Sequence, residues 1–151
     1  MLRRLLIPSV LILALYATPA FPDRAGPKQL EVWKSPSCGC CAAWVKHMGN
    51  AGYAVTTQNV ASGILAKIKQ QAGLAPELQS CHTAKVGGYI IEGHVPAEDV
   101  KRLLEEKPDA IGLAVPGMPI GSPGMEMGSE KERYEVLLVK KDGSREVFAK
   151  H

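Results

Sequence analysis

Hydrophobic and polar positions change their spacing several times along the first half of the chain. They alternate over residues 30–33, which predicts a β-strand, and residues 53–57 are a second strand candidate. Helical spacing follows each strand: apolar residues recur at i, i+3, i+4 and i+7 over residues 41–48, and at i, i+1 and i+4 over residues 64–68, before a stop at Gly73. This order favours a parallel strand pair with crossover helices.

The second half of the chain predicts two hairpins with a helix between them. The first hairpin turns at residues 87–88, and its second strand covers residues 89–92. Residues 97–106 follow with a helical stripe of apolar side chains. Near the end of the chain, residues 134–150 alternate around an Asp-Gly pair at 142–143, which is a strong hairpin signal.

Residues 111–128 differ in kind from the segments on either side. They contain three prolines and five glycines and show no periodicity, which predicts that no regular element forms there. We therefore expect a long ordered loop or a mobile flap, and this loop carries Met118, Met125 and Met127.

The first twenty residues have the pattern of a secretory signal peptide. Arg3 and Arg4 precede an apolar run and small residues, with cleavage expected near Ala20. The apolar run is about a dozen residues, shorter than the roughly 20 that a spanning helix needs, so we expect no stable membrane insertion after cleavage. Residues 21–29 would then be a flexible leader, and residues 30–151 one domain in the periplasm.

The charge of the chain excludes one class of partner. Residues 1–20 contain two arginines and no acidic residue, so their removal lowers the formal charge from +3 to +1. Basic residues form no cluster and are not interleaved with aromatic residues, which leaves nucleic-acid binding without an electrostatic basis.

Three of the four cysteines lie in the stretch SPSCGCC, where the first strand is expected to meet the first helix. Cys38 and Cys41 have CxxC spacing, and Ser37 is the expected N-cap. Helix amides and the helix dipole stabilise a thiolate there, which favours a low pKa for Cys38. Cys40 is surplus to this pair, because a disulfide between neighbouring residues is strained.

The residues leave three interpretations of the cysteines open. Two disulfides, Cys38–Cys41 and Cys40–Cys81, would be a structural arrangement common in exported proteins. A mononuclear zinc site would use the same thiols, although a vicinal pair suits a tetrahedral site poorly. A soft-metal site would exploit the preference of Cu(I) for thiolates, and crowded sulfurs can bridge several ions.

Further soft or borderline ligands lie in the second half of the chain. Methionine is usually a core filler, but the loop lacks the periodicity that would produce an apolar core stripe. We expect His47 to be exposed beside Lys46 and His151, the last residue, to be frayed. The remaining candidate ligands are His82, His94, Met118, Met125 and Met127.

Three longer motifs, SPSCGCCAAWVKHM, SCHTAKVGGYIIEGHVPAEDVKRLL and GLAVPGMPIGSPGME, occur in this order along the chain. With them the chain resembles a bacterial family of unknown function that has a CxCC motif and includes the periplasmic copper-resistance proteins called CopG. The resemblance covers residues 30–148, nearly all of the expected mature domain.

The resemblance implies a fold, a metal and a set of ligands. The fold would be α/β and thioredoxin-like, with an added C-terminal β-hairpin and the long loop rich in methionine, proline and glycine. The metal would be copper, with several Cu(I) ions per chain bridged by the sulfurs of Cys38, Cys40, Cys41 and Cys81. The family also implies a role in copper tolerance, with redox cycling of copper and contacts to other periplasmic copper-handling proteins.

Two functional hypotheses follow. In the first, the protein binds copper ions through its four cysteines, with His94 and the loop methionines as further contacts, and it needs no enzymatic activity. In the alternative, it is a periplasmic thiol-disulfide oxidoreductase in which Cys38 attacks and Cys41 resolves. Whether the chain is an enzyme therefore stays open.

Overall fold

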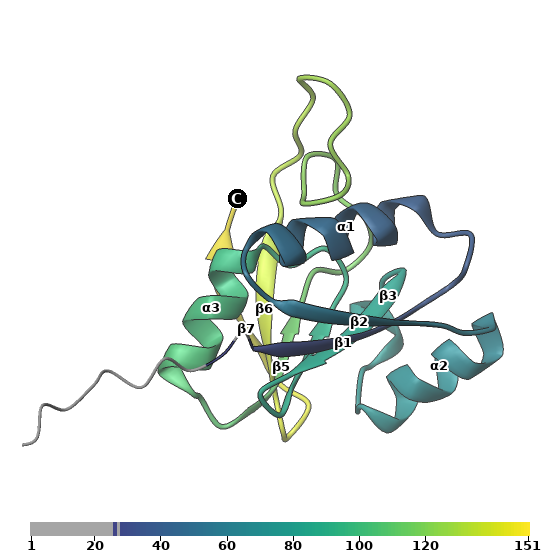
Figure 1. The fold of residues 1–151 in the computed structure, drawn as a ribbon. Helices are drawn as coiled ribbons and strands as arrows, with labels where there is room; N and C mark the ends of the chain where they lie inside the picture. The colour runs from purple at the N-terminus through teal and green to yellow at the C-terminus, as the bar shows by residue number, and fades with distance from the viewer. Residues whose placement is uncertain (1–25, 27) are drawn as a thin grey trace, which may run out of the picture.

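The computed structural model describes Gly26 and residues 28–151, which form a seven-stranded sheet with three α-helices (Figure 1). The predicted signal peptide and most of the predicted leader lie outside the described residues. The elements are β1 (Gln29–Lys34), α1 (Gly39–Asn50), β2 (Ala54–Asn59), α2 (Ser62–Gln71), a 3-10 helix (Pro76–Leu78), β3 (His82–Val86), β4 (Tyr89–Glu92), α3 (Ala97–Glu106), β5 (Ala110–Ala114), β6 (Glu135–Lys140) and β7 (Arg145–Lys150).

The sheet has the strand order β2-β1-β3-β4-β5-β6-β7. β1 and β2 are parallel and joined through α1, which confirms the predicted parallel pair. β3 and β4 form the first predicted hairpin, and α3 follows it. The mixed α/β fold is thus established, and a hairpin followed by a helix is the order expected of a thioredoxin-like domain; the thioredoxin-like assignment itself stays a prediction.

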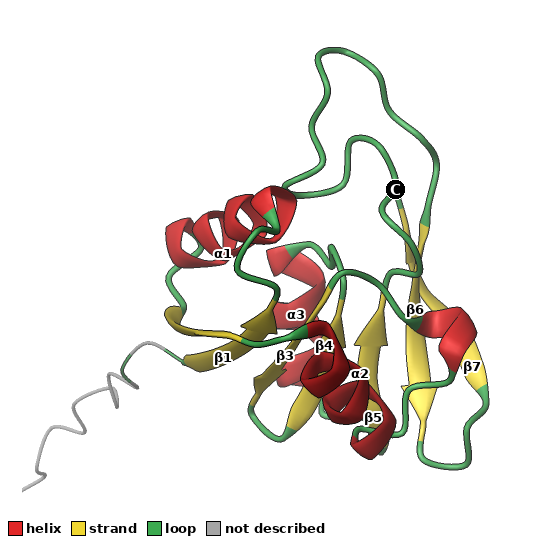
Figure 2. Cartoon of the chain, turned by 90° about the vertical axis from the view of Figure 1, so that its right-hand side faces the viewer, coloured by secondary structure: helices red, strands yellow, loops and turns green. Residues whose placement is uncertain are grey.

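The two faces of the sheet carry different helices (Figure 2). Alternate residues of β1, β3 and β4 pack with α1 and α3 in the main core, which includes Val32, Trp44, Ile91 and Leu103. The other face of β3 and β4 meets α2, where Lys69 contacts the side chains of two strand residues. Because successive side chains of a strand point to opposite faces, neighbouring residues of β3 and β4 contact the main core and α2 in turn.

The strand β5 contradicts the expectation that no regular element occurs in residues 111–128. Gly112 of β5 is paired with Ile90 of β4 in the parallel β4–β5 ladder, and a Cβ atom at Gly112 would lie 1.7 Å from the Ile90 carbonyl oxygen. The glycine therefore permits a close approach of two buried strands instead of ending a strand. The segment is irregular after Ala114, where β5 ends.

The C-terminal hairpin of β6 and β7 has the predicted position, but the chain end was mispredicted. His151 is not frayed: its backbone exchanges hydrogen bonds with Tyr134, at 3.0 and 3.1 Å, and its Nε2 lies 2.7 Å from Asp99 Oδ2. His151 also stacks on the Tyr134 ring. These contacts with Tyr134, just before β6, and with α3 hold the last residue in place.

Two exposure predictions were wrong for helix residues. Ile64, expected on the inner side of α2, is 49% exposed, because α2 turns Leu65 and Lys69 toward the sheet and Lys69 reaches a buried carboxylate there. His47 is half-buried, since its Nε2 accepts a hydrogen bond from the Ala97 backbone at the start of α3. In the part of the chain that the structure describes, the helices lack the length and apolar character needed to cross a membrane.

Candidate metal centre

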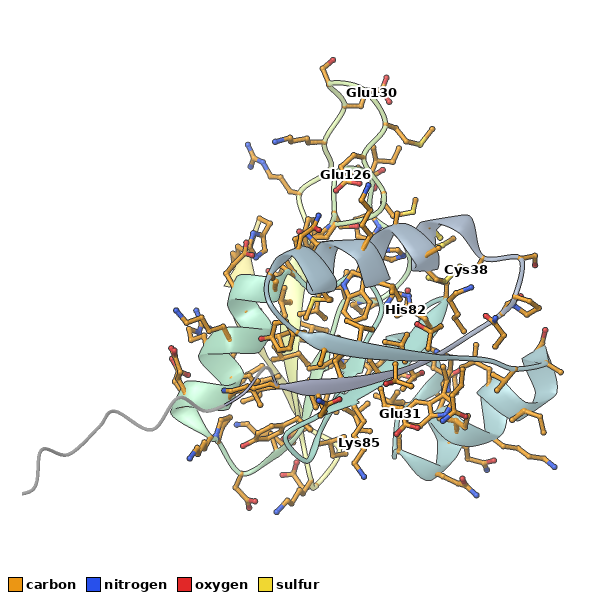
Figure 3. The ribbon with its side chains drawn as sticks, in the orientation of Figure 1. Glu31, Cys38, His82, Lys85, Glu126 and Glu130 are labelled. Carbon is orange, nitrogen blue, oxygen red and sulfur yellow. A yellow bond between two sulfur atoms is a disulfide. The ribbon has the colours of Figure 1, made fainter. Side chains whose placement is uncertain are left out.

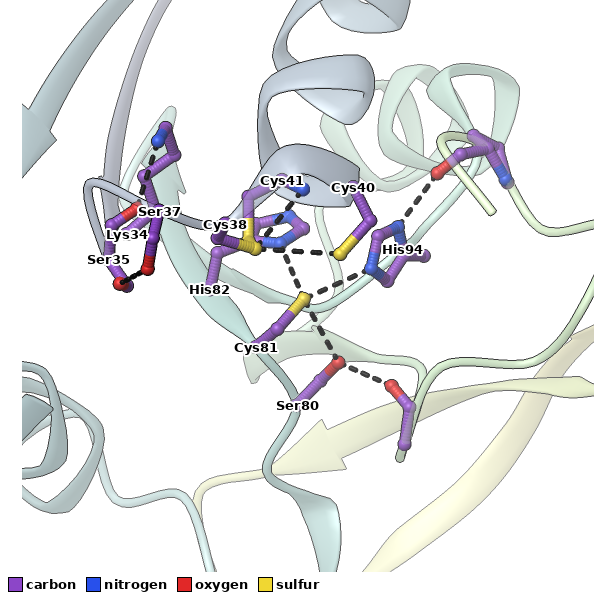
Figure 4. The surroundings of a disulfide bond; sticks show 12 residues. Lys34, Ser35, Ser37, Cys38, Cys40, Cys41, Ser80, Cys81, His82 and His94 are labelled. Carbon is purple, nitrogen blue, oxygen red and sulfur yellow. Dashed lines mark hydrogen bonds between the residues drawn. A yellow bond between two sulfur atoms is a disulfide. The ribbon is translucent and has the colours of Figure 1, made fainter. Parts of the chain in front are cut away.

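Four sulfur atoms converge where α1 begins (Figure 4). Cys38, Cys40 and Cys41 come from the first turn of α1, and Cys81 comes from the segment that leads into β3. Their sulfur atoms all lie within 4.8 Å of one another. The proximity expected of the four cysteines is therefore confirmed, and a local motif and a distant residue form one cluster.

The helix start differs from the prediction in its capping residue. Cys38 is the N-cap of α1, and its Sγ accepts a hydrogen bond from the Cys41 amide at 3.3 Å. Ser37, the predicted cap, instead has its hydroxyl 3.1 Å from that of Ser35. The sulfur thus takes the place of the usual capping oxygen, and the unpaired amides at the helix start stabilise negative charge on it in the reduced protein.

Two of the four cysteines are joined in this structure. Cys38 and Cys41 form a disulfide, with their Cα atoms 5.3 Å apart. Cys40 and Cys81 remain free, so the second bridge of the two-disulfide interpretation is not formed. The described state is therefore the oxidised one, with one disulfide and two thiols side by side.

Cys81 is surrounded by polar nitrogen atoms. Its Sγ lies 3.3 Å from His82 Nδ1 and 3.0 Å from His94 Nε2. Burial, followed by the nearby Cys40, raises the pKa of the Cys81 thiol to about 11. Cys81 is thus protonated at neutral pH in the metal-free protein, and a soft metal that binds it must displace a proton.

The two histidines complete a second group that shares Cys81. One ligand atom from each of Cys81, His82 and His94 lies within 4.8 Å of the others. The Pro123 carbonyl accepts a hydrogen bond of 2.8 Å from the Nδ1–H of His94, which leaves the Nε2 lone pair facing Cys81. Burial lowers the pKa of His94.

His82 is buried between aromatic rings, with Trp44 at 4.4 Å and His94 at 5.1 Å between ring centroids. Burial is the main cause that lowers the pKa of His82 well below its usual value, and the charges of His94, Lys69 and Lys34 lower it further. Its Nε2 has no hydrogen-bond partner among the described residues. Both rings are therefore neutral, which is the form that binds metals.

The methionine loop rises above α1, where Figure 3 labels its residues Glu126 and Glu130. Met118 and Met127 are 50% and 60% exposed, whereas Met125 is half-buried. A Cβ atom on Gly124 would lie 2.7 Å from the Cys40 carbonyl oxygen, so the loop touches the helix turn that carries the cluster. A ligand role for these methionines stays a prediction.

A buried charge network beneath Cys81 was not anticipated from the sequence. Lys69 and Glu92 form an ion pair of 2.5 Å with both side chains buried, and Glu92 also accepts the Ser80 amide hydrogen at 2.6 Å. The only signal in the sequence is that Glu92 ends the apolar run YII, where a solvent-facing glutamate is the ordinary expectation.

The donor set defines the kind of metal that suits the centre. Thiolates with neutral imidazoles at the edge favour soft and borderline ions over Mg²⁺ or Ca²⁺, which prefer oxygen. The fold and the site thus define an α/β protein with a cysteine cluster able to hold a soft metal.

Comparisons with known proteins agree with this class. Residues 78–125 match the model of the family described as protein of unknown function, DUF411. Two solved structures titled copper resistance protein copG, Form 1 and Form 2, are 40% and 39% identical to the chain; each alignment covers 83% of this chain and 98% of the other, with a TM-score of 0.77. No curated protein matches the chain significantly. The chain belongs to the CopG family.

Proposed function

We propose that the protein binds copper as Cu(I) in a multinuclear site bridged by the sulfurs of its four cysteines, in the periplasm, and thereby contributes to copper tolerance. The convergence of four sulfurs within 4.8 Å is the observation that carries this proposal. Sulfurs at this spacing suit bridging of several soft ions. Membership of a family whose solved members are titled copper resistance proteins supports the choice of copper.

Formation of this site needs the Cys38–Cys41 disulfide to be reduced. A dithiol reductant supplies two electrons and two protons, is itself oxidised to a disulfide, and returns both sulfurs as thiols, which release their protons on binding Cu(I). The same chemistry in reverse links the site to copper redox cycling: two Cu(II) ions take the two electrons of the dithiol, which yields two Cu(I), the disulfide and two protons. His82 and His94 would act as further contacts beside Cys81.

An anaerobic titration tests the copper proposal. Reduced protein is titrated with Cu(I) against a competing chelator, and bound metal and free thiols are counted in wild type and in Cys40→Ser. We expect several ions per chain in wild type and fewer in the variant, because Cys40 can serve only as an additional bridging sulfur. One ion or none in wild type, or an unchanged count in Cys40→Ser, would refute it. Zinc analysis of the same samples distinguishes a copper site from a mononuclear zinc site.

A second candidate function is thiol-disulfide exchange, and the observed disulfide favours it. Cys38 is partly exposed at a helix start, where the Cys41 amide points at its sulfur, as the attacking thiolate of an oxidoreductase requires. Reduction of insulin disulfides distinguishes the candidates. Activity that needs Cys38 but is unchanged in Cys40→Ser and Cys81→Ser, together with a low copper count, would favour exchange over copper binding.

A further inference from the structure

The buried ion pair between α2 and β4 lies on the sheet face opposite α1. Lys69 Nζ and Glu92 Oε1 are 2.5 Å apart, and relative side-chain exposure is 6% and 0%. Thr83 joins them: its hydroxyl accepts from Lys69 at 2.9 Å and donates to Glu92 Oε2 at 2.6 Å. Thr83 and Glu92 are also cross-strand partners of β3 and β4, so the pair is built into the hairpin that follows Cys81.

The contact from Glu92 to Ser80 links this network to the metal centre. Glu92 Oε1 accepts the Ser80 amide hydrogen at 2.6 Å, one residue before Cys81. The Ser80 hydroxyl donates to the Gly117 carbonyl, where the methionine loop begins. At Gly93, an added Cβ atom would lie 2.6 Å from Ser80 Cβ, so the backbone packs tightly against this segment.

Stability alone gives no reason for a buried ion pair here. Two charges lose their hydration on burial, and an apolar pair of similar volume is often as stable or more stable. An apolar pair, however, offers no acceptor for the Ser80 amide. The feature that the charged pair adds is therefore a defined position for the backbone next to Cys81.

Cys81 needs such a constraint more than the other three cysteines do. One helical turn sets the positions of Cys38, Cys40 and Cys41, whereas Cys81 lies in an irregular segment before β3. We propose that Glu92, held by Lys69, is the positioning residue for Cys81: it fixes the Ser80 amide and so keeps the Cys81 sulfur beside those of α1. The copper readout of this inference rests on the proposed function, but thiol reactivity does not.

Two double variants, both electrically neutral at this pair, test the inference. Lys69→Met with Glu92→Gln keeps an acceptor for the Ser80 amide, and Lys69→Met with Glu92→Met removes it. In metal-free protein, alkylation of Cys81 by iodoacetamide is followed by peptide mapping, with Cys40 as internal reference. We expect Cys81 of the variant with methionine at both positions (Met/Met) to react about tenfold faster than in wild type, because the loss of one hydrogen bond makes local opening about tenfold more frequent. The variant with methionine and glutamine (Met/Gln) should react at the wild-type rate.

Copper binding gives the second readout. The Cu(I) affinity of the reduced Met/Met variant, measured by chelator competition, should fall by about the same tenfold factor, while the Met/Gln variant keeps the wild-type affinity. If wild type itself binds no copper but the alkylation rates follow the expected order, the positioning role stands and the proposed function fails. Equal alkylation rates in the two folded double variants would overturn the positioning role.

A matched control separates positioning from general loss of stability. Asp99 is another buried carboxylate, 5% exposed and paired with His151 away from the cluster. Asp99→Asn should lower the free energy of unfolding but leave the rate of Cys81 alkylation and Cu(I) binding unchanged. Faster Cys81 alkylation or weaker Cu(I) binding in Asp99→Asn would contradict the inference. If the Met/Met variant does not fold, Thr83→Val replaces it. That variant should accelerate Cys81 alkylation by a smaller factor, and no acceleration would count against the inference.

Discussion

The cluster consists of two cysteine pairs with different origins. Cys38 and Cys41 share one helical turn, are three residues apart and form a disulfide. Cys40 and Cys81 come from different segments, remain thiols and approach each other only because the sheet brings β3 beneath α1. The proximity of the first pair therefore follows from local sequence, whereas the proximity of the second pair depends on the tertiary structure. Only the second pair distinguishes copper binding from thiol-disulfide exchange, since both functions use the first.

Substitution of the adjacent residues Cys40 and Cys41 gives the largest expected contrast. Cys41→Ser should slow catalytic disulfide exchange strongly, because the resolving thiol with CxxC spacing is lost, and should also lower the copper count. Cys40→Ser should lower only the copper count. Insulin reduction and Cu(I) titration of both variants measure the difference. Equal behaviour of the two variants in both assays would mean that the pairs have no separate roles.

The oxidation state of the first pair should control copper uptake by the second. Protein with the Cys38–Cys41 disulfide has Cys40 and Cys81 as its two free thiols, too few to bridge several ions, so we expect it to bind at most one Cu(I). Reduced protein should bind several. Mass spectrometry of native protein before and after anaerobic reduction counts the ions. Similar counts in both states would show that the disulfide sulfurs take no part in the site.

A smaller effect is expected at the edge of the second pair. His94 Nε2 lies 3.0 Å from Cys81 Sγ, and the ring is oriented by the Pro123 carbonyl. His94→Gln should weaken Cu(I) binding by about tenfold, the lower end of the effect of groups that support metal ligands. Chelator competition measures the affinity, and the same measurement on Met118→Leu, at an exposed position of the loop, tests whether that predicted methionine ligand contributes.

The smallest effect concerns the proton of Cys81. The raised pKa of this thiol, about 11, arises first from burial and then from Cys40. In oxidised Cys40→Ser, where Cys81 is the single free thiol, the pKa should remain raised by burial but fall below the wild-type value, because the neighbouring sulfur is gone. The pH dependence of Cys81 alkylation gives both values. A higher pKa in the variant would contradict the proximity of the two thiols.

Much of the fold around the cysteine cluster could be predicted from the sequence, because the sequence patterns that indicate it are local. The CxxC spacing, the helical stripe from Cys41 to Met48 and the hairpin that follows Cys81 each appear within a few residues. Once β1 and β3 are placed side by side, the meeting of all four cysteines follows. The copper family was recognised from the same motifs.

The errors have a common physical cause, which is contact between distant segments. Gly112 resembles a loop residue until Ile90 is seen against its backbone, and His151 resembles a loose end until Asp99 and Tyr134 are placed beside it. The Lys69–Glu92 pair was missed for the same reason, since each charge alone suggests a solvated surface. At each of these positions, contacts with residues distant in the sequence determine the local structure and the burial of the side chain.

Gly124 connects the loop to the cluster in a way that can be compared across related chains. A Cβ atom there would lie 2.7 Å from the Cys40 carbonyl oxygen and 2.8 Å from the Trp44 amide nitrogen, and the glycine has φ of +86°. Even one methyl group would therefore have to lift the loop from the helix. We expect relatives that share this loop path to keep glycine at this position. A relative with a larger residue there should carry a displaced loop and a more open sulfur cluster.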